Sequence, residues 1–242
     1  MVLAAPARPP APPVGPHAPV RRPRRGAGRD RLIRWVAKPA VFALCLIPLG
    51  WIGWLAATGG LGVNPIEAMI RSLGDWALRF LLIALAVSPV KEIFGWPVVM
   101  RFRRMLGLFA FFYVVVHLSS WIGIDQFFAW PLIWADIVKR PFITVGMLAL
   151  FLLIPLAGTS TSGMIKRLGA RRWKRLHMLV YPAAILGCLH FAMMVKADLR
   201  EPLIYAGVLT GLLGWRVATC WRPRRIAAAA GGTAARSPAI GA

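Results

Sequence analysis

The sequence is poor in acidic residues. Only 8 of its 242 residues are Asp or Glu, against 30 Lys and Arg, and 58% are hydrophobic. No soluble fold could bury so much apolar surface, so the long uncharged runs predict a helical protein that crosses a membrane several times. The formal net charge of +22 could suggest nucleic-acid binding. The basic residues lie in short clusters between apolar runs, however, which is how membrane topology is encoded, and we expect no nucleic-acid partner.

Cysteine is also scarce. Cys45, Cys188 and Cys220 show no C-x-x-C spacing, which excludes a disulfide framework and a zinc or iron–sulfur pattern. The sequence has no G-x-G-x-x-G motif, no P-loop and no other phosphate-binding loop. We therefore expect this chain to carry no nucleotide-binding domain of its own.

Six apolar segments are long enough to cross a bilayer, given about 20 residues per span. They are residues 37–57, 75–92, 105–124, 141–159, 175–196 and 202–220. The sequence therefore predicts an all-α fold, a six-helix transmembrane bundle.

The segments between these spans alternate in basic content, and those expected on one side hold very few basic residues. The residues of this poor set are Arg71, Lys139, Arg140, Lys196 and Arg200. Because Lys and Arg accumulate on the cytoplasmic side, the asymmetry predicts that both termini are cytoplasmic.

The two ends of the chain differ in composition from the spans. Residues 1–34 are rich in Pro, Ala and Arg and are predicted to be a disordered cytoplasmic tail. Paired arginines in this tail could indicate an export signal, but no hydrophobic region follows them closely. The six-span domain is expected at 35–220, followed by a second short disordered tail at 221–242.

Three of the four histidines lie in predicted spans, His117 in the third and both His177 and His190 in the fifth. Ionisable groups inside spans are rare and usually functional, which favours a metal, a cofactor or a proton relay. At about 1.5 Å per residue, His117 and His190 reach similar depths on the outer half, whereas His177 lies near the cytoplasmic face. Two neutral imidazoles from facing helices at one level are the arrangement that holds a b-type heme in a bundle.

A second heme is a weaker prediction. His177 lies about 20 Å below His190 along the axis, which would suit two hemes stacked across a bilayer. On a straight helix these two side chains point about 140° apart, although Pro182 could kink or unwind the helix between them. Thirteen residues before His117 stands Arg104, so a second symmetrical histidine pair is absent. A second heme would need another axial ligand, a vacant site or a shared histidine.

Several stretches carry a resemblance to a known family, among them RFRRMLGLFAFFYVVVHLSSW (101–121) and GTSTSGMIKRLGARRWKRLHMLVYPAAILGCLHF (158–191). They resemble the heme-binding membrane subunit of the bacterial methionine-sulfoxide reductase system, the MsrQ or YedZ type, in the ferric-reductase-like transmembrane superfamily. The resemblance runs from about residue 35 to 220. Further segments that carry it are 61–70, 77–90, 140–147 and 202–207.

The resemblance implies a multi-pass protein of the bacterial inner membrane that binds heme b, one or two per chain. It would pass electrons from the quinone pool or a cytoplasmic flavin reductase to a periplasmic molybdopterin enzyme that reduces methionine sulfoxide. The family's histidines correspond to His117, His177 and His190, as axial ligands of heme iron. The family is also associated with FMN, with no residue assigned. The missing histidine at Arg104 is typical of this branch.

Other polar residues are weaker candidates. Arg79 lies one turn inside the second span and could pair with a heme propionate, and snorkelling to the interface is an equally good explanation. Arg103 and Arg104 could do the same near the inner face, although anchoring by positive charge explains them more simply. Residues 159–162 are Thr, Ser, Thr and Ser and could bind a flavin phosphate, but satisfaction of the helix end is the stronger expectation.

Two other functions remain open. One is a ferric reductase or quinol-linked cytochrome b with a different electron acceptor. The other is a proton channel or transporter with a histidine relay, which would predict broken helices or internal repeats, and neither is clear in the sequence. A structural anchor would not need three buried histidines. We expect an electron-transfer subunit rather than the site of sulfoxide reduction.

Overall fold

The computed structural model describes residues 27–195 and 198–234. All regular structure within these residues is helical, which confirms the all-α prediction. The chain divides into two units, residues 1–39 and residues 40–242, and the core and the cavity described below belong to the second.

Short 3₁₀ or π-helical turns separate some of the α-helices. The α-helices are α1 (Ala27–Leu32), α2 (Lys38–Thr58), α3 (Pro65–Phe94), α4 (Arg103–Ser120), α5 (Trp130–Lys139), α6 (Pro141–Gly158), α7 (Ser162–Leu176), α8 (Val180–Met194) and α9 (Arg200–Ala234). The turns are η1 (Ile33–Ala37), η2 (Pro97–Arg101), η3 (Trp121–Asp125) and η4 (His177–Leu179).

Four helical segments of the described residues are long and apolar enough to cross a membrane. They are Asp30–Thr58, Arg103–Asp125, Pro141–Gly158 and Ser162–Met194. Helices α3 and α9, with 30 and 35 residues, cover the two other predicted spans but are not in this set. The count of six spans and the cytoplasmic termini therefore stay predictions.

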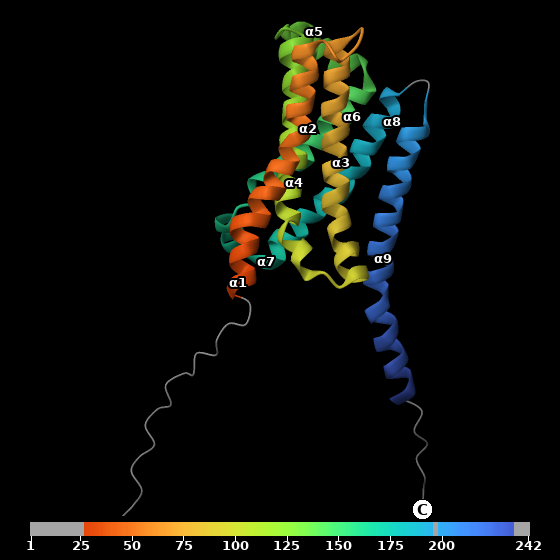
Figure 1. Ribbon diagram of the computed structural model, residues 1–242. Helices are drawn as coiled ribbons and strands as arrows, with labels where there is room; N and C mark the ends of the chain where they lie inside the picture. The colour runs from red at the N-terminus through yellow and green to blue at the C-terminus, as the bar shows by residue number, and fades with distance from the viewer. Residues whose placement is uncertain (1–26, 196–197, 235–242) are drawn as a thin grey trace, which may run out of the picture. The chain divides into compact units, whose positions relative to one another are not determined.

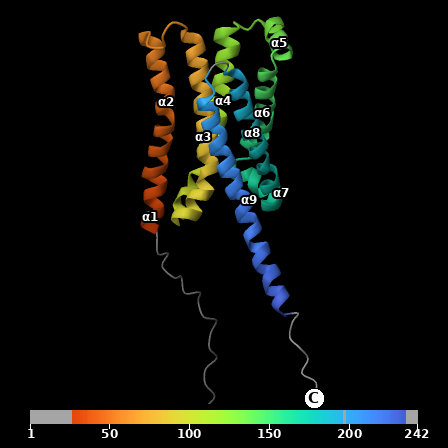
Figure 2. The same ribbon diagram turned by 90° about the vertical axis from the view of Figure 1, so that its right-hand side faces the viewer.

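Helix α3 forms much of the core of residues 40–242. It packs against α4, α8 and α9, and α6 packs against α4 and α8; Figures 1 and 2 show α3, α4, α6 and α8 running alongside one another. Residues 77–87 of α3 are almost all apolar, so this helix can be buried on several faces. Its buried residues are Leu73, Ala77, Leu78, Phe80, Leu81, Leu82, Ala84, Leu85 and Val87.

Tyr113 of α4 ties α2 to the core. Its ring is fully buried, and its hydroxyl accepts a hydrogen bond from the Leu49 N–H (3.0 Å) and donates one to the Cys45 carbonyl (2.9 Å). In a regular α-helix this N–H and this carbonyl would bond to each other. Pro48 lies between them inside α2 and disturbs that turn. The Tyr113 hydroxyl therefore bonds to two backbone groups of α2, one on each side of Pro48.

Two helices lie in connections between predicted spans. Helix α5 follows η3 and reaches the start of α6, and α7 joins α6 to η4. Figure 1 shows α5 at one end of the bundle and α7 toward the other. The Thr161 side chain caps α7 by accepting a hydrogen bond from the Met164 N–H at 3.3 Å. The exposed residues of α7 include Lys166, Arg167, Arg171, Arg172, Lys174 and Arg175.

The helices extend past both predicted boundaries of the transmembrane domain. Helix begins at Ala27, inside the predicted tail 1–34, and α9 continues to Ala234, beyond residue 220. Ala and Arg are among the strongest helix formers, so this composition permits helix where a disordered tail was expected. The rest of both predicted tails, with His17, lies outside the described residues.

The fifth predicted span is not one straight helix. The 3₁₀ turn η4 separates α7 from α8, so His177 and His190 belong to different elements. Pro182 has no N–H and leaves the carbonyl of residue 178 without its helical partner, and η4 contains that residue. The 140° separation expected for a straight helix therefore does not apply.

Candidate functional site

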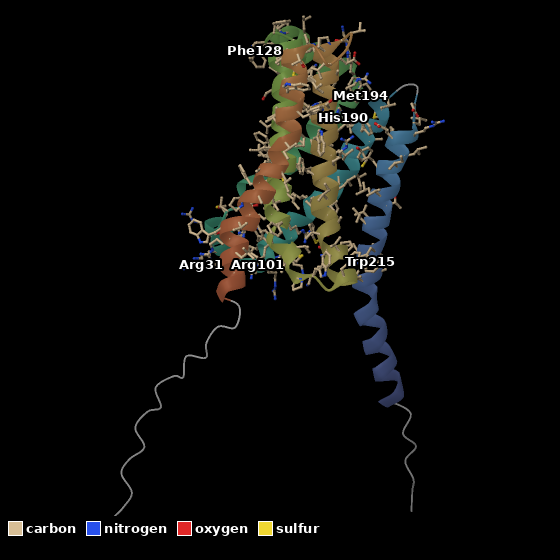
Figure 3. All side chains as sticks on the ribbon, viewed as in Figure 1. Arg31, Arg101, Phe128, His190, Met194 and Trp215 are labelled. Carbon is tan, nitrogen blue, oxygen red and sulfur yellow. The ribbon has the colours of Figure 1, made fainter. Side chains whose placement is uncertain are left out.

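His117 and His190 lie side by side on different helices. His117 comes from α4 and His190 from α8, their ring centroids are 6.3 Å apart, and the ring planes make an angle of 78°. Figure 3 shows His190 closer to the end that carries Phe128 than to the end that carries Arg101 and Trp215. The structure thus brings together the two histidines to which the sequence assigns similar depths.

Each of the two rings is held by a backbone carbonyl from a helix that carries neither histidine. Nδ1 of His117 lies 2.9 Å from the Ile70 oxygen of α3, and Nδ1 of His190 lies 2.7 Å from the Phe142 oxygen of α6. A carbonyl oxygen can only accept, so each Nδ1 must carry the proton and donate. Nε2 of each neutral imidazole then has a free lone pair, which is the state that binds a metal.

The spacing of the rings fits one metal ion between them. A metal–imidazole bond is about 2 Å long and a ring nitrogen lies about 1.2 Å from the ring centre, so two opposed ligands have centroids about 6.4 Å apart. The observed separation is 6.3 Å. Two axial imidazoles leave four positions around the metal, the number that a porphyrin supplies. The donor set and its spacing therefore fit a heme.

A cavity of about 570 Å³ adjoins both histidines, which is within the usual range of ligand pockets. Its walls come from α3, α4, α6 and α8 and are mainly apolar, with residues such as Leu78, Leu81 and Leu150. Its charged lining residues come from the N-terminal part of α3, from η3 and from the residue that precedes α6. They are Glu67, Arg71, Asp75, Asp125 and Arg140.

The two arginines of this lining are each held by a carboxylate one helical turn away. Arg71 forms an ion pair with Glu67, and Arg140 Nε lies 3.1 Å from an oxygen of Asp136. Both arginine side chains remain about half exposed, at 49% and 56%. Each guanidinium can therefore accept a further anionic partner.

Arg79 does not line this cavity. Its Nε donates to the Tyr205 hydroxyl of α9 at 2.7 Å, and its guanidinium lies over the Trp76 ring, 4.9 Å from the centroid. The hydrogen bond joins α3 to α9, whereas Trp76 lies on α3 itself. The prediction that Arg79 pairs with a propionate therefore gains no support from the cavity lining, which contains Arg71 and Arg140.

His177 lies apart from the other two histidines. It stands on η4 and makes an edge contact with Trp173, with centroids 3.9 Å apart, and it does not line the cavity. Its Nδ1 is buried and has no hydrogen-bond partner. Within the described residues, no group of three or more His, Cys, Asp or Glu side chains could hold a metal ion.

Arg103 and Arg104 are bonded to groups near the α7 end of the bundle. Arg103 Nη1 donates to the Ser88 hydroxyl at 3.1 Å. Arg104 Nη1 lies 3.3 Å from the Ser160 carbonyl and 3.5 Å from the Ser162 hydroxyl. Arg104, which replaces a histidine in the symmetrical pattern, therefore ties α4 to the start of α7.

The hydroxyl groups of residues 159–162 mainly serve helix ends. Thr159 and Ser160 donate to carbonyls of α6 at 2.6 and 2.7 Å, and Thr161 caps α7. This is the arrangement that the sequence favours over a flavin phosphate site.

Sequence reasoning missed the two carbonyls that hold the histidines and the two arginines at the cavity. A backbone carbonyl leaves no mark on the sequence. In the sequence, Arg71 and Arg140 stand out only as two of the few basic residues in the connections predicted to lie outside the cytoplasm. Nothing in their spacing links them to His117 or His190.

Known proteins are similar to this chain over most of its length. A family model described as "Ferric reductase like transmembrane component" matches residues 73–188. A protein of Rhodospirillum rubrum is 59% identical over 197 residues, covering 81% of this chain and 93% of the relative. A protein of Caulobacter vibrioides is 49% identical over 205 residues, covering 85% and 96%. One of Polaromonas naphthalenivorans is 50% identical over 202 residues, covering 82% and 92%. All three are named "Protein-methionine-sulfoxide reductase heme-binding subunit MsrQ".

Proposed function

Because the chain belongs to the MsrQ family of heme-binding subunits, we propose that it binds a b-type heme in the cavity between α4 and α8. His117 and His190 are the axial ligands in this proposal. The observation that carries it is the pair of imidazoles 6.3 Å apart, each held through Nδ1 by a backbone carbonyl.

A bound heme supplies a centre that can take up and release one electron. The chain's own residues would set its environment. The Nε2 atoms of His117 and His190 would hold the iron, and the apolar walls would exclude water and keep the dielectric low. Arg71 and Arg140 would offer their guanidinium groups to the two propionates, because both line the cavity and Arg79 does not.

We propose that the protein is the electron-transfer subunit of a methionine-sulfoxide reductase system in the bacterial inner membrane. Electrons would come from the quinone pool or a cytoplasmic flavin reductase and leave to a periplasmic molybdopterin reductase. The names of the relatives support the reductase partner, and the four apolar helical segments support the membrane location. The donor and the molybdopterin cofactor of the partner rest on the family resemblance.

A second heme and an FMN remain proposals with less support. The second heme rests on His177, whose buried Nδ1 has no hydrogen-bond partner and is free to bind a ligand. No second histidine is paired with it within the described residues. The match to a ferric-reductase family model keeps a different electron acceptor as the alternative function.

Spectra of the protein purified in detergent test the proposed heme site. Dithionite should produce the absorption bands of a b-type heme. His117→Ala or His190→Ala should sharply lower the heme content, because the cavity would then hold the iron through one imidazole instead of two. His177→Ala is the matched control and should keep it, since His177 lies outside the cavity. Wild-type protein without b-type bands, or full heme content in both cavity variants, would refute the proposal.

A further inference from the structure

Two glycines face the two histidines of the cavity. A Cβ placed on Gly74 of α3 would lie 3.2 Å from both Nδ1 and Cε1 of His117. A Cβ placed on Gly146 of α6 would lie 2.9 Å from Nδ1 and 3.0 Å from Cε1 of His190. A Cβ at Gly146 would force the His190 ring to move, whereas a Cβ at Gly74 would require the His117 ring to give by a few tenths of an ångström.

Each glycine stands four residues after the carbonyl that holds its histidine. Ile70 lies four residues before Gly74, and Phe142 lies four residues before Gly146, which is the spacing of an α-helical hydrogen bond. In a helix, the side chain at position i+4 leans back over the carbonyl of residue i, which is why Ser and Thr there can bond to it. Glycine at i+4 leaves that carbonyl open to an incoming imidazole N–H.

The same arrangement occurs twice in the fold. Helix α4 docks His117 on α3, and α8 docks His190 on α6, with donor and acceptor separated by 47 and 48 residues. Both glycines, both acceptor residues and both histidines line the same cavity. The two glycine–histidine contacts share the i, i+4 spacing, the same ring nitrogen and the same cavity. Chance packing would not be expected to produce this arrangement twice.

We propose that Gly74 and Gly146 are positioning residues that fix the tautomer and the direction of the two axial imidazoles. By opening the carbonyls of Ile70 and Phe142, they place the proton on each Nδ1 and leave each Nε2 for the iron. This inference rests on the proposed heme site. It adds that helices α3 and α6, which supply no axial ligand, determine how the ligands bind.

Alanine substitutions give a graded test. Gly146→Ala should push His190 away from its carbonyl, and Gly74→Ala should displace His117 by less. Loss of the partner of a metal-bound histidine usually lowers affinity about 10- to 100-fold, so we expect heme affinity to fall about 10-fold or more in Gly146→Ala. Gly107→Ala is the matched control, because Gly107 also lies in a helix, α4, and its Cβ would meet nothing within 4 Å.

The decisive readout is the ligation of the heme that remains bound. Full-length variants are purified in detergent, and carbon monoxide binding to the reduced protein is measured with the low-spin signal of the ferric protein. An intact pair of imidazoles should exclude carbon monoxide. A displaced imidazole opens one coordination position, so carbon monoxide should bind to Gly146→Ala and to part of Gly74→Ala, and not to Gly107→Ala.

A purely structural role would lower the yield of protein without changing the ligation of the retained heme. Wild-type ligation in both cavity variants would therefore overturn the proposal. If Gly146→Ala does not accumulate, Gly74→Ala decides by the same measurement, since its contact is milder. Wild-type protein that binds no heme would instead refute the proposed function, which is a separate result.

Discussion

At the scale of single residues, the site depends on hydrogen bonds that orient its side chains. His117 and His190 have little choice of tautomer, because their Nδ1 partners are carbonyl oxygens. Outside the cavity, a buried hydroxyl group also has its orientation fixed by backbone partners. The Tyr113 hydroxyl bonds to both the Leu49 N–H and the Cys45 carbonyl of α2 and thereby joins two helices.

Tyr113→Phe should destabilise the protein. The change leaves the Leu49 N–H and the Cys45 carbonyl without the hydroxyl that serves both, and each unpaired buried group costs about 1–3 kcal/mol. Thermal unfolding in detergent should show a lower midpoint. Tyr181→Phe is the control, since the Tyr181 hydroxyl makes no hydrogen bond within the described part of the chain. Equal midpoints for the two variants would contradict this role of Tyr113.

Depth along a helix could be predicted from the sequence, but direction around it could not. His117 and His190 meet because the rise per residue is constant within a helix. Arg79 turns to Tyr205 and Trp76 instead of the cavity, and no count of residues reveals that choice. The carbonyls of Ile70 and Phe142 carry no side-chain signal at all.

At the scale of helices, α5 has two distinct faces. Ile133 is buried, whereas Trp130, Trp134 and Val138 are 63%, 69% and 68% exposed and lie on one stripe with a spacing of four residues. This helix connects two segments that are able to span a membrane, so it lies at the level where both leave the bilayer. Exposed tryptophans at that level are typical of a membrane interface.

We therefore predict that the exposed stripe of α5 lies on lipid. A fluorescent probe attached to cysteine at position 134 should be quenched by lipid-phase quenchers in nanodiscs. The same probe at position 139, where an exposed Lys ends the helix, should be quenched less. Equal quenching at both positions would show that α5 does not rest on the membrane.

The short helices and the 3₁₀ turn show what the hydropathy pattern leaves out. The sequence predicts six spans from its apolar runs, because bilayer thickness sets the length of a spanning helix. The α7 segment contains six exposed basic residues and reads as a loop, although Thr161 caps it as a helix. Pro182 predicted an irregularity at the position of η4, because proline has no N–H to bond to the carbonyl of residue 178.

At the scale of the whole molecule, electron transfer to a periplasmic reductase requires a particular orientation in the membrane. The basic clusters predict cytoplasmic termini, which puts the charged residues of the cavity near the periplasmic face. A fluorescent-protein fusion at the C-terminus should be fluorescent, and a phosphatase inserted in the connection before α5 should be active. The reverse pattern would place the cavity on the cytoplasmic side and exclude direct transfer to a periplasmic reductase.

The central claim is that both axial ligands of one heme are histidines. The cavity offers another choice, because Met147, Met193 and Met194 also line it, and Figure 3 shows Met194 and His190 on the same helix. Methionine as the sixth ligand would raise the reduction potential. Near-infrared magnetic circular dichroism of the purified ferric protein distinguishes the two ligand pairs. We predict the charge-transfer band of bis-histidine ligation, and a histidine–methionine band or a high-spin spectrum would contradict the account.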